Sequence, residues 1–119
     1  MKQVLFRNWL CNVHLGKYHN GRSALRLTDA VNNAPIATCT INEPLHQYPT
    51  KDNWVLIKNY SENKGIYKAL LDAGVIEPMM DINQDESHHV ILCEIPTDVY
   101  NKLEENKTFR SLGLGEDYG

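Results

Sequence analysis

Alternating hydrophobic and polar positions near the start of the chain predict a β-strand. In residues 5–16 the odd positions from Trp9 to Leu15 are apolar, which is the period of a strand with one buried face. We expect one long strand here, with Trp9 in the core and a cost of about 3–5 kcal/mol for removing its ring. The following Asn20-Gly21 pair tolerates positive φ in a tight turn and predicts a hairpin.

Further segments complete a predicted antiparallel sheet of about five strands. The alternation resumes in residues 23–31, and β-branched side chains dominate residues 36–41. Strands are also predicted over residues 54–58 and 88–95. The first of these two, Trp-Val-Leu-Ile-Lys, is apolar on both faces apart from its end, which is typical of a central strand.

Two helices are predicted from apolar spacing and capping residues. Asn59 and Glu62 have the form of a capping box, and the apolar face that follows ends before Gly74, a residue suited to a left-handed C-cap. The second helix is predicted over residues 97–106, with Thr97 as its N-cap.

Strands joined by tight turns and followed by helices predict an α+β domain. We expect a single antiparallel sheet with both short helices packed on one face. Residues 1–107 form this single domain, and the glycine-rich residues 108–119 form a flexible C-terminal tail. Residues 42–53 and 75–87 lack periodicity and are expected to be irregular loops.

Composition narrows the class of function. The 119 residues suit one domain, and 42% hydrophobic residues supply its core. A formal net charge of -3 argues against generic nucleic-acid binding, which is usually carried by basic chains. The longest purely apolar run, Val90 to Cys93, is far shorter than the roughly 20 residues that cross a bilayer. The chain is therefore expected to be cytoplasmic, without membrane contact, and homo-oligomerisation stays open.

Cysteine and histidine spacing gives no metal-binding or catalytic pattern. Three cysteines are an odd number that suits a reducing cytosol, and we expect them to be small core residues: Cys11, Cys39 and Cys93. His14 and His88 are expected to face outward from strands. Residues 81–85 match the start of a calcium loop, but the sixth and twelfth positions do not fit, so a solvated acidic connection is predicted. No metal, no cofactor and no catalytic residue is assigned.

The segment from Ile57 to Gly65 carries two interpretations. Helix capping accounts for Asn59 and Glu62, and the close approach of another backbone or a partner would account for Gly65, which is costly inside a first helical turn. The run Ile-Lys-x-x-Ser-Glu-Asn-x-Gly, followed by Leu-Leu-Asp-Ala-Gly-Val-Ile, resembles a family of small uncharacterised proteins of phages, plasmids and conjugative elements. This resemblance covers about residues 36–95 and implies a mobile-element context, but no catalytic residues.

These observations lead to a hypothesis of stoichiometric binding. We expect a phage or mobile-element accessory protein that binds a host or defence-system protein, for example as an anti-CRISPR or other anti-defence inhibitor; an enzyme is the less favoured class. The predicted contact residues are aromatic and polar groups near the strand-to-helix junction: Tyr48, Tyr60, Asn63 and Lys64. They lie together only if the 42–53 loop folds back along the sheet. The partner is expected to have a basic surface. The alternative is a small enzyme or a ligand-sequestering protein with a pocket edged by the same loop.

Overall fold

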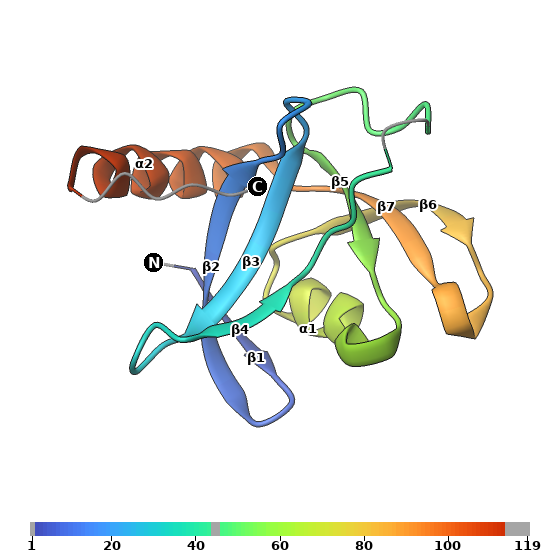
Figure 1. The fold of residues 1–119 in the computed structure, drawn as a ribbon, viewed down its shortest axis with the longest axis horizontal. Coiled ribbons are helices and arrows are strands. Elements are labelled where there is room, and N and C mark those ends of the chain that lie inside the picture. Colours follow the sequence, from blue (N-terminus) through green and yellow to red (C-terminus); the bar gives the residue numbers. More distant parts are fainter. Residues whose placement is uncertain (1, 44–45, 114–119) are drawn as a thin grey trace.

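The protein is an α+β structure with two antiparallel sheets and two α-helices. The computed structural model describes residues 2–43 and 46–113 (Figure 1). One sheet has the order β1-β2-β3-β4, formed by Gln3–Phe6, Trp9–Lys17, Ser23–Asp29 and Pro35–Thr38. The other has the order β5-β7-β6, formed by Trp54–Lys58, Val90–Glu94 and Glu77–Asn83. The predicted α+β class is confirmed, but the prediction of a single sheet of about five strands is wrong.

A short extended segment after β4 joins the two sheets. The Cys39 amide donates to the Leu25 carbonyl of β3 at 2.8 Å, and the Lys58 amide of β5 donates to the Cys39 carbonyl at 2.8 Å. The Ile41 amide adds a bond of 3.1 Å to the Leu56 carbonyl. Strand β5 is thus paired with β7 on one side and with this segment on the other, as its apolar sequence predicts.

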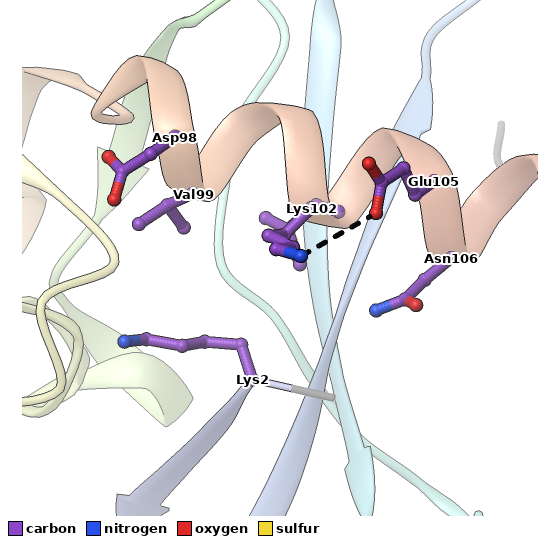
Figure 2. Close-up of a pocket in the computed structure, with 7 residues that line it drawn as sticks. Lys2, Asp98, Val99, Lys102, Glu105 and Asn106 are labelled. Carbon is purple, nitrogen blue, oxygen red and sulfur yellow. Dashed lines mark ion pairs between the residues drawn. The ribbon is translucent and has the colours of Figure 1, made fainter.

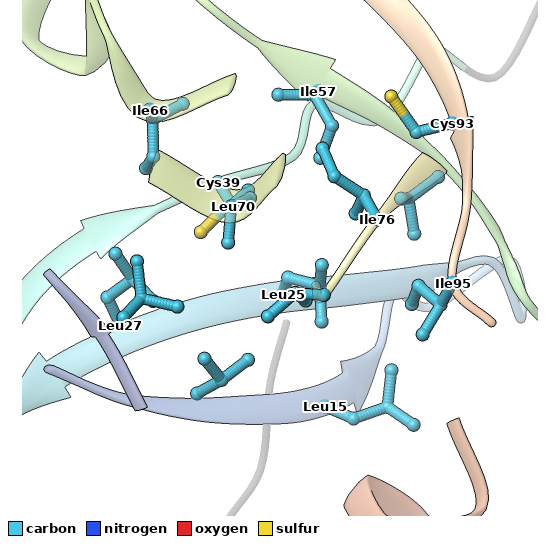
Figure 3. Close-up of a cluster of buried hydrophobic side chains, with 14 of the residues drawn as sticks. Leu15, Leu25, Leu27, Cys39, Ile57, Ile66, Leu70, Ile76, Cys93 and Ile95 are labelled. Atoms are coloured by element: carbon cyan, nitrogen blue, oxygen red, sulfur yellow. The ribbon is translucent and has the colours of Figure 1, made fainter. Parts of the chain in front are cut away.

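The two sheets and both helices enclose one main core (Figure 3). Helix α1 (Ile66–Asp72) buries Ile66 and Leu70 in it, and α2 (Thr97–Gly113) contributes Leu103. The strands supply other large side chains, including Leu15, Leu25, Leu27 and Ile57, and Ile95 directly after β7 adds another. The helical faces expected from the sequence are therefore the buried faces.

The predicted long first strand is broken into a hairpin. Arg7 has a φ of 56°, and the chain reverses there so that β1 pairs with β2. The odd positions from Cys11 to Leu15 are buried as expected, but Trp9 is 46% exposed. Trp9 lies at the end of the hairpin, beyond the strands that cover the neighbouring odd positions of β2. The predicted burial of Trp9 is wrong, and the large cost of removing its ring does not apply.

His14 on β2 is buried, which contradicts its expected outward position. It is 4% exposed, and its Nε2 lies 2.7 Å from the Thr28 hydroxyl on β3. Both faces of this part of the sheet are therefore covered. His88 is exposed as expected, but it belongs to the 3-10 turn η2 (Glu86–His88) instead of a strand.

Two element boundaries differ from the prediction. Residues 75–87 contain the strand β6, although the sequence predicts an irregular loop there. Among the residues of this strand only Ile82 is partly buried, so the strand has no buried face and its sequence shows no apolar alternation. Helix α2 continues to Gly113, so residues 108–113, which the sequence assigns to the tail, are helical. The rest of the predicted tail, residues 114–119, lies outside the described residues.

The start of α1 is built differently from a capping box. The Asn59 side-chain oxygen accepts from the amides of Gly65 and Tyr67, both at 3.1 Å, with the 3-10 turn η1 (Ser61–Asn63) in between. Gly65 is the N-cap and has a φ of 94°. A methyl group added to it would meet no other part of the described chain within 4 Å. Backbone conformation, and not a close approach of another described part of this chain, therefore explains this glycine.

Candidate functional site

The long loop before β5 folds back along the sheet and brings two predicted site residues onto one cluster. Tyr48 and Tyr60 both pack against the small buried cluster of Leu56, Val90 and Leu92 on the second face of the β5-β7-β6 sheet. This is the arrangement on which the predicted surface depended. The two tyrosines are only partly buried, so each keeps a surface for contact.

Arg22 holds this loop in place. Its guanidinium donates to the carbonyls of Glu43 at 2.6 Å and of His46 at 2.7 Å. The Tyr48 amide donates to the His46 ring nitrogen Nδ1 at 3.0 Å, and the Tyr48 ring lies 6.2 Å from that of Trp54. Both hydrogen bonds from Arg22 end on backbone carbonyls, so Arg22 fixes the backbone of the loop independently of the loop's side chains.

Tyr60 lies in a polar environment at the other end of the cluster. Its ring centroid is 5.3 Å from that of His88 and 5.2 Å from the Lys58 ammonium. The same ammonium lies 2.8 Å from the Glu62 carboxylate. Hydrogen bonding from Lys58 is the main reason why the pKa of Glu62 falls to about 2. The charges of Lys58 and Glu62 beside Tyr60 are therefore paired with each other and do not converge on a ligand position.

Asn63 is buried, which contradicts its predicted place on a partner surface. It is 1% exposed, and its side-chain amide donates to the Thr38 carbonyl at 2.6 Å. Its oxygen Oδ1 has no hydrogen-bond partner among the described residues. Asn63 fastens the η1 turn to the end of β4, which is a structural role.

Lys64 is exposed as predicted, but it lies beside the β1-β2 hairpin. Arg7 donates from Nη2 to the carbonyls of Glu62 at 3.0 Å and Lys64 at 3.4 Å. The Arg7 guanidinium also lies over the Phe6 ring, 4.9 Å from its centroid. The predicted site is thus divided: its tyrosines lie on the β5-β7-β6 sheet, and Lys64 lies by the hairpin.

An exposed apolar surface at this hairpin was not predicted. Leu5 and Leu10 are directly opposite in the pairing of β1 with β2, so their side chains share a face, and they are 64% and 49% exposed. Trp9 pairs with Phe6 on the opposite face of the hairpin and is 46% exposed at its end. The Ala30 amide donates to the Leu10 carbonyl, which brings the turn with the exposed Val31 alongside. We use the name hairpin patch for these exposed apolar residues at and beside the hairpin, which lie on both of its faces: Leu5, Trp9, Leu10 and Val31. The signal that was available is Arg7-Asn8, two polar residues in the middle of an apolar alternation.

One hollow lies between Lys2 and helix α2 (Figure 2). It has a volume of about 530 Å³, and charges of both signs alternate along it: Lys2, Asp98, Lys102 and Glu105. Lys102 and Glu105 form an ion pair of 3.9 Å. Alternating exposed charges of this kind are typical of a solvated helix face and do not hold one substrate charge.

A smaller hollow lies where the alternative hypothesis places a pocket. It measures about 260 Å³ and is lined by residues 20–22 and 49–52, so the 42–53 loop does edge it. Arg22 contributes to the lining, but its guanidinium is engaged by the loop carbonyls. What remains is a shallow polar surface with Lys51 and Asp52 at its margin.

The three cysteines are all buried, as predicted. Burial raises the pKa of each thiol, that of Cys93 to about 12. A thiol with a raised pKa is a poor nucleophile, because the thiolate is the reactive form. Across residues 2–43 and 46–113, no three His, Cys, Asp or Glu side chains form a group that could hold a metal ion.

Comparisons with protein-family models, with curated proteins and with solved structures found no significant match for this chain. No helix in the described part of the chain is long and apolar enough to cross a membrane.

Proposed function

We propose that this chain is a binding protein that acts by stoichiometric contact with a protein partner through the hairpin patch. The observation that carries the proposal is the exposure of four large apolar side chains at and beside the β1-β2 hairpin, with Val31 94% and Leu5 64% exposed. Exposed apolar groups gathered in this way mark interaction surfaces in soluble proteins. Tryptophan is also the residue type that most often dominates binding energy.

Basic groups adjoin the patch and define its rim. Arg7 stands at the hairpin turn between Phe6 and Trp9, and Lys64 is exposed next to it. A partner would therefore fill the centre with apolar side chains and meet Arg7 and Lys64 with polar or acidic groups. Tyr48 and Tyr60 remain part of the proposal as a second contact area on the neighbouring sheet.

The kind of partner is proposed from the sequence. The resemblance of residues 36–95 to proteins of phages and plasmids supports a host or defence-system protein in the cytosol as the target. The alternative, a ligand-sequestering protein or small enzyme, would use the shallow hollow beside the 42–53 loop. Its engaged Arg22 and its polar lining favour the binding protein over this alternative.

The binding experiment compares the wild-type chain with Leu10→Ser and Trp9→Ser as bait for proteins of a bacterial host. We expect a protein retained by wild type at equimolar ratio and lost with either variant, by about tenfold or more in affinity. His19→Ser, exposed just beyond the far end of β2, is the matched control and should bind as wild type does. Equal retention by all four chains would contradict the proposal.

The biological class has its own test. The chain is expressed in a bacterium with an active CRISPR–Cas system that restricts an incoming phage. Restored plaque formation with wild type, and its loss with Leu10→Ser, would support an anti-defence role. Unchanged restriction with a folded chain would argue against inhibition of that system and leave the hairpin patch to be judged by the binding experiment.

A further inference from the structure

Strand β6 presents a free edge. It is the last strand in the order β5-β7-β6, and β7 is its only partner among the described strands (Figure 1). Six of its seven residues are exposed, including Met79 and Met80, each 43% exposed. Half of the amides and carbonyls of an edge strand point away from the sheet and are available for pairing with another chain.

The stretch of sequence that contains this edge is acidic. Residues 69–101 contain no Lys or Arg, and they hold seven of the 15 acidic residues of the chain. Four exposed carboxylates stand on β6 and the turn after it: Glu77, Asp81, Asp85 and Glu86. His89 lies 3.3 Å from Asp81, but its ring is charged only when protonated.

Charge and shape decide what could occupy the edge. A second copy of β6 would bring its own carboxylates opposite these, and like charges facing each other across strands are destabilising. Pro78 and the two register shifts against β7 further oppose indiscriminate pairing. A segment whose Lys or Arg side chains face these carboxylates is instead attracted to the edge.

We propose that the free edge of β6 binds an extended basic segment of a partner protein by strand addition. Main-chain hydrogen bonds supply the pairing, as in other cases in which a peptide extends a sheet. The acidic side chains select for basic residues, and Met79 and Met80 offer flexible apolar contacts to the residues between them. This inference does not depend on the hairpin patch, which is a separate surface.

The test uses a synthetic peptide with alternating Lys and Val, matched in length to the seven residues of β6. Its control is the same peptide N-methylated at every peptide bond, which keeps every charge but has no backbone amide left to donate to the edge of β6. Isotope-labelled protein is titrated with each. We expect the first peptide to shift the amide signals of residues 77–83, and the methylated one to bind at least about tenfold more weakly.

Variants separate the edge from general attraction. Glu77→Lys should weaken peptide binding by about fivefold, whereas the matched change Glu105→Lys on α2 should alter it by less than about twofold. Leu10→Ser should bind the peptide as wild type does, so a failure here is distinguishable from a failure of the hairpin patch. The inference is overturned if both peptides bind equally, if neither binds at about 1 mM, or if the shifted signals lie outside β6.

Discussion

Replacing Asn63 tests whether the junction before α1 is a fixed part of the fold. Asn63→Ala removes the hydrogen bond of 2.6 Å to the Thr38 carbonyl from a side chain that is 1% exposed. The lost bond is worth about 1 kcal/mol. The void left by the amide adds about 1 kcal/mol, and removal of the unpartnered Oδ1 offsets part of this. We therefore expect the free energy of unfolding to fall by about 1–2 kcal/mol.

Asn63→Asp sharpens the test through its pH dependence. An ionised carboxylate at this position faces the Thr38 carbonyl without a donor, so the pKa of the new side chain should lie above its unfolded value of about 3.9. The folded state then binds more protons between the two pKa values, and stability relative to wild type should fall as pH rises above about 4. Near or below that pH the protonated group can donate to Thr38, and the difference from wild type should be smallest.

The assay is urea-induced unfolding of wild type and variants at several pH values. Lys64→Ala is the control, because an exposed neighbour should change stability by less than about 0.5 kcal/mol. The reasoning is refuted if Asn63→Ala costs no more than Lys64→Ala. It is also refuted if the difference between Asn63→Asp and wild type is the same at every pH.

Three further predictions concern the backbone, an ion pair and the thiols. Gly65→Ala should cost about 1–2 kcal/mol in urea unfolding because of its φ of 94°, and Gly65→Asn should cost less; equal costs would contradict the conformational explanation. Lys58→Met should raise the pKa of Glu62 from about 2 toward its usual range, as followed by an NMR titration. In wild type, the Lys58–Glu62 pair stabilises the fold at pH values above the unfolded pKa of Glu62, and this stabilisation is lost as the pH falls. If the pKa of Glu62 is unchanged in Lys58→Met, then Lys58 is not the cause of the low pKa. The buried thiols of Cys11, Cys39 and Cys93 should not react with Ellman's reagent near pH 8 until urea unfolds the chain. Prompt reaction of any one of them would mean that it is exposed.

Elements with a one-sided apolar pattern or a strong turn signal could be predicted from the sequence. The Asn20-Gly21 hairpin forms as expected, with Gly21 at a φ of 87°. The burial of Ile66 and Leu70 follows from helical spacing. In these cases the local pattern and the tertiary environment favour the same structure, so the sequence is sufficient.

Elements that depend on distant contacts were missed. Strand β6 has no buried face, so hydrophobic alternation cannot reveal it; its pairing with β7 defines it. Arg7 occupies a left-handed turn without being Gly or Asn, which hides the break between β1 and β2. Asn63 resembles a surface residue in sequence, and only the position of Thr38 shows that it is enclosed.

The distribution of charge also changes the expected electrostatics of binding. From a net charge of -3 alone, association with a basic partner should slow as salt rises. In the structure four exposed carboxylates lie on β6 and the turn after it, whereas Arg7 and Lys64 lie by the hairpin patch. Screening therefore acts to different extents on the two surfaces: a basic segment at β6 should bind more weakly as salt rises, while binding at the hairpin patch, where apolar contact dominates and only Arg7 and Lys64 add charge, should change less. Salt dependence measured for a captured partner would thus report which of the two surfaces it uses.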